Sequence, residues 1–247
     1  MTKPMDEIKG RVAAVVVTYN RAEMLRQCLM SLQKQTMPCD ILVVDNASTD
    51  DTQALVQRAA QHDASIFYRN TGENLGGAGG FNFGMRWAVE TGYAFVWVMD
   101  DDCFPEPVAL EKLLDADRLL QGEYGWLSSV ALWTDGRECR MNRPKIKKNF
   151  YDRIELLRDG ILLAEQATFV SLFLKAETIR AVGLPVKEFF IWGDDIEYTR
   201  RITIRGKMPC YVVGQSRVIH AMKNNSGSNL AVDSVEGMLE FASGRTQ

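Results

Sequence analysis

Three consecutive carboxylates, Asp100, Asp101 and Asp102, stand at the end of an apolar run and are the residues best suited to hold a cation. Adjacent carboxylates repel one another, and each one that is left unpaired in a partly buried place is costly. A hard divalent cation such as Mg²⁺ or Mn²⁺ relieves that cost, because it prefers carboxylate oxygens together with substrate phosphates. We expect the alternate pair, Asp100 and Asp102, to converge on one ion. The alternative is an acidic cap on the helix that follows.

A second acidic pair, Asp194 and Asp195, follows an aromatic and apolar stretch. Carboxylates beside apolar groups can be tuned to act as general bases, although the same residues also suit the first turn of a helix over 196–204. His220 ends a further apolar run. A lone histidine in such a place is more often structural, but beside a carboxylate-bound metal its imidazole would complete the coordination.

Asp45 and a glycine-rich stretch at 72–80 also follow apolar runs. Asp45 is able to accept a hydrogen bond from N3–H of uracil, and the alternative is a loop that caps the next helix. The glycines match the dinucleotide-binding fingerprint only in part, and no P-loop motif occurs in the sequence. They would still let backbone approach a ligand, and the helix that follows would favour an anion at its start. A tight turn before a helix is the other interpretation.

The elements that must position these residues alternate between strand and helix patterns. Short runs rich in β-branched residues predict buried strands at 12–17, 41–44, 65–68 and 95–99. Asn20, with Glu23 three residues later, predicts a capping box for the first helix. Ser48 to Asp51 opens a second helix, which reaches about residue 60. Such repeats predict an α/β fold with a Rossmann-like, mostly parallel central sheet, helices on both faces, and every polar cluster at the carboxyl ends of the strands.

The second half of the sequence has a less regular pattern. Residues 168–174 predict a buried strand, and residues 176–182 predict a short helix that ends at Gly183. The charged region 135–165 predicts a solvated loop, with a mobile lid or an acceptor contact as the alternative. Residues after 222 are polar and predict a flexible tail or a packing helix.

Composition excludes several classes of protein. A net charge of −3 over 247 residues argues against a general nucleic-acid binder, so we expect no nucleic-acid partner. The five cysteines form no CxxC pair, which indicates reduced thiols in a cytoplasmic protein. The polar first residues indicate no signal peptide, and the apolar runs are too short to cross a bilayer. Any contact with a membrane is therefore expected to be peripheral.

Five motifs together resemble those of family 2 glycosyltransferases. In chain order they are VVVTYNR at 15–21, VVDNAS at 43–48, NLGGAGG at 74–80, DDD at 100–102 and WGDDIEY at 192–198. His220 resembles the family's late metal-binding histidine, and the match spans roughly residues 12–222. The resemblance implies the glycosyltransferase-A fold, a nucleotide-sugar donor, a divalent metal and inversion at the anomeric carbon.

The resemblance also implies a role for each matching residue. Those that would bind the donor are Thr18, Asn20, Arg21, Asp45, Asn74, Gly77 and Asp100. Those that would hold Mn²⁺ or Mg²⁺ on the diphosphate are Asp100, Asp102 and His220. Asp195 would be the catalytic base that removes the acceptor proton, and Trp192 and Asp194 would shape the acceptor side.

Within the family, the glycine-rich motif and the WGDDIEY motif look most like those of galactofuranosyltransferases. This implies UDP-galactofuranose as donor, a glycan or lipid-linked glycan as acceptor, and a role in cell-surface polysaccharide biosynthesis. Rhamnosyltransferases that use dTDP-rhamnose share much of the pattern. More remote alternatives are a sugar nucleotidyltransferase and a non-catalytic nucleotide-sugar binding module.

The expected organisation is one catalytic domain over residues 1–222. Its nucleotide-sugar half would end at about residue 102, and its acceptor half would comprise residues 103–222. Residues 223–247 would form the C-terminal tail or packing helix. Because the additional domains of polymerising members are absent from this chain, we expect single sugar additions.

Overall fold

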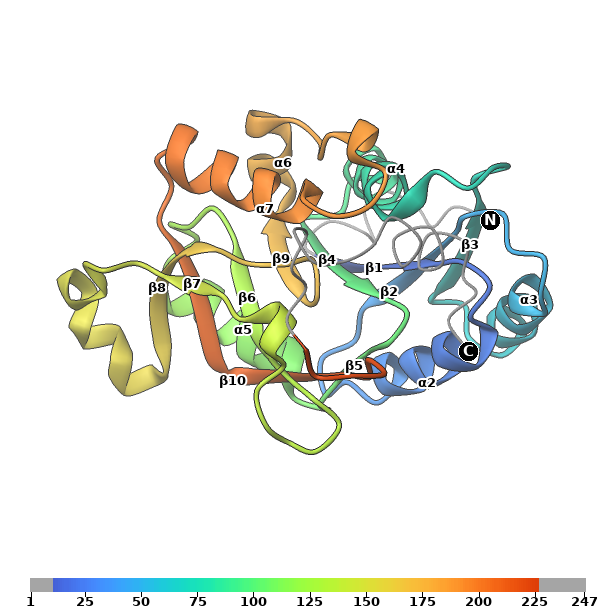
Figure 1. Cartoon of the computed structure of the whole chain (residues 1–247), viewed down its shortest axis with the longest axis horizontal. Helices are drawn as coiled ribbons and strands as arrows, with labels where there is room; N and C mark the ends of the chain where they lie inside the picture. The colour runs from blue at the N-terminus through green and yellow to red at the C-terminus, as the bar shows by residue number, and fades with distance from the viewer. Residues whose placement is uncertain (1–10, 227–247) are drawn as a thin grey trace.

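The structure is a computed structural model that describes residues 11–226 (Figure 1). Strands β1 (Val12–Thr18), β2 (Asp40–Asp45), β3 (Ile66–Asn70) and β4 (Phe95–Asp100) lie in the order β3-β2-β1-β4. All three pairings among them are parallel. The four strands that the β-branched runs predicted are therefore confirmed, each within two residues of its expected ends.

The register of these strands brings their carboxyl ends to one edge of the sheet. Thr18 pairs with Asp45, and the preceding residue Val17 pairs with Asp100. Polar side chains from three separate parts of the sequence therefore meet at one place. This is the position at which open α/β sheets bind their ligands.

The second half of the chain extends the same sheet beyond β4. Its strands are β5 (Cys103–Pro105), β6 (Leu127–Leu132), β7 (Lys145–Ile146), β8 (Ile161–Gln166), β9 (Leu172–Lys175) and β10 (Cys210–His220). The order continues as β4-β9-β6-β10-β8-β7, and β5 pairs with β10. Strand β10 is parallel to β6, whereas β9 is antiparallel to β4. The sheet is therefore parallel in its first half and mixed in its second.

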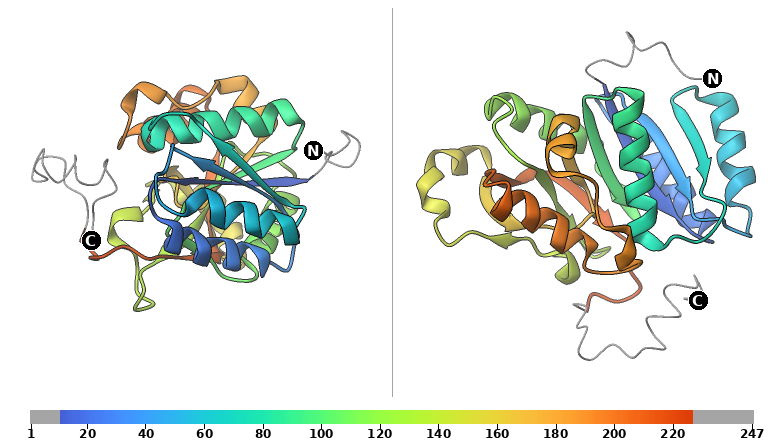
Figure 2. Two further views of the ribbon diagram at one scale, coloured as in Figure 1. Left: turned by 90° about the vertical axis from the view of Figure 1, so that its right-hand side faces the viewer. Right: turned by 90° about the horizontal axis from the view of Figure 1, so that it is seen from above.

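Helices cover both faces of the sheet (Figures 1 and 2). Side chains along β1 alternate between two hydrophobic cores, because successive residues of a strand point to opposite faces. One core is covered by α2 (Ala22–Gln33), α3 (Thr52–His62) and α5 (Ala109–Leu119), and the other by α4 (Gly76–Thr91), α6 (Ala176–Val182) and α7 (Asp194–Arg200). The predicted helices on both faces are confirmed.

The glycine-rich stretch is part of a helix rather than only the turn before it. Helix α4 begins at Gly76, so four of the glycines lie within it. Strand β1 excludes a side chain at two of the helix positions that face it, since a Cβ at Gly80 would lie 2.5 Å from Val17 and a Cβ at Gly84 would lie 2.3 Å from Val15. These glycines therefore allow close packing of α4 on β1, a requirement that outweighs their low helix propensity.

The predicted capping box at Asn20 is wrong. Helix α2 starts after Arg21, whose side chain makes no capping hydrogen bond, and the first N–H of the helix, that of Ala22, donates to Asp50 Oδ2 at 3.0 Å instead. Asn20 has a φ of 54°, and its Oδ1 accepts a hydrogen bond from the backbone N–H of Thr49 at 2.7 Å. Tertiary contact between two loops has replaced the local cap that the sequence suggested.

The region 135–165 is more ordered than a solvated loop. It contains β7, most of β8 and two 3₁₀ segments, η1 (Arg140–Asn142) and η2 (Phe150–Asp159). The strand predicted at 168–174 is confirmed only from Leu172, and Ser171 before it has a φ of 61°. The helix predicted at 196–204 begins two residues earlier, as α7, and ends in the π turn η4 (Arg201–Arg205).

A short 3₁₀ turn, η3 (Lys187–Phe189), precedes α7. No helix of the described chain is both long and apolar enough to cross a membrane. The predicted tail or packing helix at 223–247 lies outside the described residues from 227 onward.

Candidate active site

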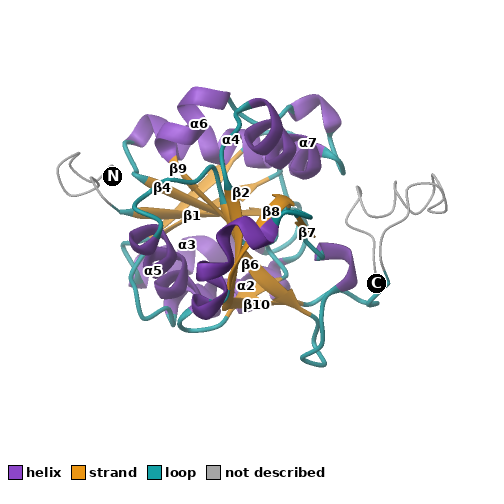
Figure 3. Ribbon diagram, turned by 90° about the vertical axis from the view of Figure 1, so that its left-hand side faces the viewer, coloured by secondary structure: helices purple, strands orange, loops and turns teal. Residues whose placement is uncertain are grey.

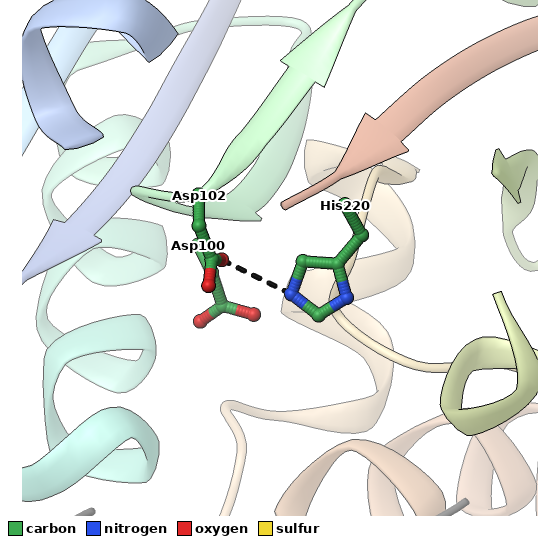
Figure 4. Close-up of side chains that lie close together, drawn as sticks. All are labelled: Asp100, Asp102 and His220. Carbon is green, nitrogen blue, oxygen red and sulfur yellow. Dashed lines mark hydrogen bonds and ion pairs between the residues drawn. The ribbon is translucent and has the colours of Figure 1, made fainter. Parts of the chain in front are cut away.

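Two carboxylates and one imidazole meet at the carboxyl edge of the sheet (Figure 4). Asp100 ends β4, Asp102 follows it, and His220 ends β10. Their ligand atoms all lie within 4.8 Å of one another, and His220 Nε2 is 3.0 Å from Asp102 Oδ1. The antiparallel pairing of β5 with β10 places His220 opposite Cys103 and so brings the histidine to the carboxylates. We call these three residues the Asp–Asp–His cluster.

Asp101 points away from this cluster and is fully engaged elsewhere. It accepts a hydrogen bond from Thr18 Oγ1 at 2.7 Å and pairs with Arg21 Nη1 at 3.0 Å. The same guanidinium pairs with Asp102 through Nη2 at 2.9 Å. Arg21 was expected to bind the donor nucleotide. It is also the cation that balances the charge of Asp101 and Asp102.

The second nitrogen of His220 has a partner that the sequence did not reveal. His220 Nδ1 is 2.7 Å from Asn142 Oδ1, and Asn142 Nδ2 donates to Thr168 Oγ1 at 2.9 Å. Nδ1 therefore donates to Asn142, and Nε2 is the nitrogen that faces the carboxylates and would bind a metal once it has lost its proton. No sequence signal could have found Asn142, because an isolated asparagine in a charged loop has no characteristic spacing.

Electrostatics of the cluster suit a divalent cation. Burial and the charge of Asp102 raise the pKa of Asp100 to about 7. Although burial acts in the opposite sense, the adjacent imidazolium of His220 holds the pKa of Asp102 well below its usual range. Burial alone would lower the pKa of His220, but the Asp102 carboxylate raises it to about 10. Two carboxylates and an imidazole with a fixed tautomer therefore fit a Mn²⁺- or Mg²⁺-type ion.

The residues expected to bind the nucleotide hold two loops together. Asp45 is fully buried, and its carboxylate accepts hydrogen bonds from the Ser48 backbone N–H at 2.8 Å and from the Tyr68 hydroxyl at 2.6 Å. Asn20 connects the same loop to the one after β1, as described above. A nucleotide base would have to share the remaining lone pairs of Asp45. Tyr68, which the motifs did not include, is the additional residue here.

The start of α4 lies beside these loops. Asn74 Oδ1 accepts a hydrogen bond from the Gly76 backbone N–H at 2.9 Å. A Cβ at Gly77 would meet nothing within 4 Å, so the helix start is open at this residue, although Gly76 and Ala78 on either side are buried. A helix start with open space beside it is suited to an anionic group.

The segment expected on the acceptor side docks onto the same helix start. The Phe190 carbonyl accepts a hydrogen bond from the Ala78 backbone N–H at 3.1 Å. Phe190 and Trp192 have φ values of 61° and 66°. Such values are unfavourable for residues other than glycine and persist only where the surrounding contacts hold the backbone in place. This docking places Asp194 and Asp195, at the start of α7, on the side of the sheet that α4 covers.

The two carboxylates of α7 differ in exposure. Asp194 is 6% exposed, whereas Asp195 is partly exposed. Burial, together with the charge of Asp195, raises the pKa of Asp194 to about 7. Burial raises the pKa of Asp195 to about 6, against the effect of backbone N–H groups. Asp195 is therefore the more accessible of two carboxylates whose basicity is increased.

Comparison with known proteins decides the family. Residues 13–119 match the model described as glycosyl transferase family 2. Over 80% of the chain, the sequence is 32% identical to galactofuranosyltransferase GlfT1 of Mycolicibacterium smegmatis, and it covers 67% of that protein. The chain belongs to glycosyl transferase family 2. The family that the motifs predicted is confirmed, and with it the predicted class of enzyme.

Other relatives of this family 2 chain are named for two different activities, galactofuranosyl transfer and mannosyl transfer. It is 32% identical to galactofuranosyltransferase GlfT1 of Mycobacterium tuberculosis strain H37Rv, with 80% of the chain and 66% of that protein aligned. It is 31% identical to an undecaprenyl-phosphate mannosyltransferase of Micrococcus luteus, with 80% of the chain and 79% of the relative aligned. The chain thus spans about two thirds of the length of its mycobacterial relatives.

Solved structures bear out the fold. GalNAc-T7 with UDP, GalNAc and Mn²⁺ superposes with a TM-score of 0.72 at 14% identity, over 96% of this chain and 48% of that one. Residues 1–349 of TarS from S. aureus, in complex with UDP, superpose with a TM-score of 0.64 at 18% identity, over 86% and 60% of the two chains. The family 2 chain has the predicted glycosyltransferase-A fold.

Proposed function

We propose that this chain is a metal-dependent, inverting hexosyltransferase that takes its sugar from a nucleotide diphosphate. The observation that carries the proposal is the Asp–Asp–His cluster at the carboxyl edge of the sheet. Arg21 and His220 pair with Asp101 and Asp102, but the ion pairs of the described chain include none to Asp100, and a buried carboxylate without a cation raises the free energy of the folded state. Family membership adds the class of donor.

Asp100, Asp102 and His220 are the proposed ligands of Mn²⁺ or Mg²⁺. The ion would neutralise negative charge on the diphosphate leaving group. Arg21 holds Asp101 and Asp102 in place through its two ion pairs and adds positive charge beside the phosphates. Asn142 holds the His220 ring so that Nε2 faces the cluster.

Asp195 is the proposed catalytic base. It removes the proton of the acceptor hydroxyl as that oxygen attacks the anomeric carbon from the face opposite the diphosphate. The pKa of about 6 keeps Asp195 ionised near neutral pH and makes it more basic than an ordinary aspartate. Trp192 and Asp194 shape the acceptor side of the same segment.

The donor nucleotide occupies the loops after β1 and β2 and the start of α4. The residues assigned to it are Thr18, Asn20, Arg21, Asp45, Asn74, Gly77 and Asp100. Open space at Gly77 leaves room for an anion beside the helix start, where Asn74 and Phe190 already accept from the N–H groups of Gly76 and Ala78. Asp45, shared with Ser48 and Tyr68, would accept from the base.

The proposed donor is UDP-galactofuranose, and the proposed acceptor is a glycan or lipid-linked glycan of a cell-surface polysaccharide. Support comes from the relatives named galactofuranosyltransferase. A mannosyl donor is the main competitor, since the Micrococcus luteus relative is named a mannosyltransferase. A dTDP-rhamnose donor remains the alternative from the motifs.

One assay tests both the activity and the donor. The purified chain is incubated with Mn²⁺ and, in turn, UDP-galactofuranose, dTDP-rhamnose and a nucleotide-linked mannose, and release of the nucleoside diphosphate is measured. We expect release from UDP-galactofuranose, loss of it in excess chelator, and recovery when Mn²⁺ or Mg²⁺ is added back.

Three outcomes contradict parts of the proposal. Full turnover in excess chelator would show that the reaction does not need a metal. Release of nucleoside diphosphate from another donor alone would show that the donor is not UDP-galactofuranose. Tight UDP binding without turnover on any donor and acceptor tested would favour the non-catalytic binding module, and pyrophosphate release from UTP and a sugar phosphate would favour the nucleotidyltransferase.

A further inference from the structure

Apolar side chains are exposed in a row on η2, far from the Asp–Asp–His cluster. Tyr151, Ile154 and Leu157 are 68%, 47% and 47% exposed. They are spaced three residues apart, which is the repeat of a 3₁₀ helix, although the segment is kinked at Arg153. Leu156 and Phe150 point inward and pack against the core. The segment is therefore anchored from below while it presents an apolar outer face.

Basic side chains surround this apolar row. Lys147 and Lys148 precede η2, and neither they nor Lys207 takes part in an ion pair within the part of the chain that the structure describes. A cavity of about 420 Å³ lies between η2 and the end of η4, and its lining includes Lys147, Arg153 and Lys207. Asp152 is the one carboxylate in that lining, and it already accepts a hydrogen bond from Asn149.

The end of η4 adds to the same surface. Thr203 and Lys207 line the cavity together with η2, and between them Ile204 is 50% exposed. Arg205 beside it is also exposed. The charge here is opposite to that of the whole chain, whose net charge is −3. We call this surface, made by 147–158 and 203–207, the η2 face.

We propose that the η2 face docks onto a bilayer that contains anionic lipids. In this arrangement Tyr151, Ile154, Leu157 and Ile204 enter the boundary between headgroups and acyl chains, and Lys147, Lys148 and Lys207 meet lipid phosphates, one of them in the cavity. Exposed aromatic and aliphatic side chains ringed by lysine and arginine are the chemistry of interfacial membrane binding. Charge complementarity favours an anionic bilayer as the partner. A purely apolar partner would desolvate Lys147, Lys148 and Lys207 without giving them a negative charge to pair with.

Such docking leaves the active site accessible. Tyr211 of the cavity stands at the start of β10, whereas His220 of the cluster stands at its end. The two residues therefore lie at opposite ends of β10, whose pairing with β6 shifts register between Val213 and Arg217. In Figure 3, which shows the end of the molecule that carries β7 and β8, the segment before β8 lies at the front. The membrane would therefore contact the end of the molecule, beside the edge where the ligands gather.

Vesicle co-sedimentation of the full-length protein tests the proposal. We expect binding to vesicles of phosphatidylcholine mixed with phosphatidylglycerol, weak binding to phosphatidylcholine alone, and loss of binding at high salt. Each basic residue near an anionic surface changes affinity about fivefold, so Lys147→Ala with Lys148→Ala should weaken partitioning about 30-fold. Ile154→Ser with Leu157→Ser should weaken it by at least about tenfold.

Matched variants control for exposure and charge. Leu119, on α5, is 47% exposed, as is Leu157, so Leu119→Ser should bind vesicles like the parent. Lys34→Ala with Arg58→Ala removes two exposed positive charges elsewhere and should reduce binding much less than the Lys147 and Lys148 pair. Release of nucleoside diphosphate from a donor, measured without vesicles, should be unchanged in every variant, because none lies in the active site.

Three results would overturn the proposal. One is a parent protein that stays in the supernatant with anionic vesicles. Another is vesicle binding that the η2-face variants leave intact, which would place the contact on a different part of the chain. The third is a dimer in sedimentation velocity that Leu157→Ser dissociates, without vesicle binding, which would assign the face to a second copy.

Discussion

Three adjacent aspartates have three different sets of partners. Asp101 is bound by Thr18 and Arg21, Asp102 by Arg21 and His220, and Asp100 makes up the cluster with Asp102 and His220. Asp100 ends β4, whereas Asp101 and Asp102 lie in the turn before β5, and this turn brings Asp101 to Thr18 and Asp102 to His220. One arginine thus pairs with the two carboxylates that follow the strand, and one of these two, Asp102, also belongs with Asp100 to the candidate metal site.

The assignment of the base predicts a clear separation of binding from turnover. Asp195→Asn keeps the size of the side chain but removes its basicity. It should retain UDP and metal binding while the rate of transfer falls about 10²–10⁴-fold. Steady-state kinetics together with UDP calorimetry measures both effects. Asp194→Asn is the matched control and should cost less in rate and more in acceptor affinity; the opposite pattern would exchange the two roles.

A pH profile gives an independent check on the same residue. Burial raises the pKa of Asp195 to about 6, and the base must be unprotonated to act. The rate should therefore be level above pH 7 and fall about tenfold per pH unit below 6. The Asp194→Asn variant should keep this inflection at or slightly below 6, since it loses the neighbouring charge. A parent rate that is independent of pH down to 4.5 would be incompatible with Asp195 as the base.

Asn142 should act on metal affinity through His220. Its amide oxygen fixes the histidine tautomer, and loss of such an outer hydrogen bond typically weakens metal binding about 10–100-fold. Asn142→Ala should therefore need more Mn²⁺ for half-maximal rate, while its rate at saturating Mn²⁺ stays near that of the parent. His220→Ala should weaken Mn²⁺ more, and Asp102→Asn most, because the diphosphate and water replace a neutral ligand more readily than a charged one.

A titration of rate against Mn²⁺ in the three variants distinguishes these effects. If Asn142→Ala has the parent's Mn²⁺ dependence and only a lower melting temperature, then Asn142 serves the fold and not the cluster.

At the scale of elements, helix α4 packs close to the sheet because its glycines have no Cβ atom. A Cβ at Gly84 would lie 2.3 Å from Val15 and 3.0 Å from Val44, both in the parallel half of the sheet. Helix α4 therefore packs directly on the strands that end at the site, and its first turn reaches the segment that carries Asp194 and Asp195. The distance between the donor side and the acceptor side depends on this contact.

Gly84→Ala should destabilise the protein despite the better helix propensity of alanine. Overpacking of a core typically costs about 1–3 kcal/mol, against a gain of about 1 kcal/mol from propensity. We expect a net loss of up to about 2 kcal/mol in urea unfolding. Gly77→Ala, whose Cβ would meet nothing within 4 Å, is the control and should leave the unfolding free energy unchanged or slightly higher. Equal stability of the two variants would contradict this packing.

At the scale of the whole molecule, the candidate metal site joins the two halves of the chain. Asp102 comes from the end of the parallel half of the sheet, and His220 comes from the last strand of the mixed half. A ligand bound by both halves stabilises the folded state, because the unfolded chain does not hold the three residues together.

Metal and UDP together should therefore raise the melting temperature. At ligand concentrations about 100 times the Kd, the stabilisation is about 2.7 kcal/mol, which for a chain of this size corresponds to about 5–10 °C. Differential scanning fluorimetry with Mn²⁺, UDP and both measures it. Asp102→Asn should lose the shift caused by Mn²⁺, whereas Asp195→Asn should keep it. An identical shift in the Asp102→Asn variant would place the ion elsewhere.

Local patterns were sufficient to predict the elements of the first half. Continuous β-branched runs, such as 12–17, form strands wherever both faces are covered, so their type and order follow from the sequence. Parallel topology then implies that the polar residues after each strand share an edge. The grouping of Asp100 with Asp102 was predicted from their alternate positions in the acidic run.

Tertiary structure decided which distant residues meet. The pairing of His220 with Asp102 depends on β5 and β10 lying antiparallel, and neither strand carries a local signal for that partner. Asn142 and Tyr68 were not predicted for the same reason, because single polar residues acquire a role only from the side chains that packing places beside them. Asn20 and the glycines of α4 show the converse, since contacts with a neighbouring loop and with β1 outweighed their local preferences. The sequence by itself thus determined the elements and the chemistry at the edge of the sheet. Long-range register and packing determined which partners each polar group contacts, because the free energy of such a contact depends on residues far apart in the chain.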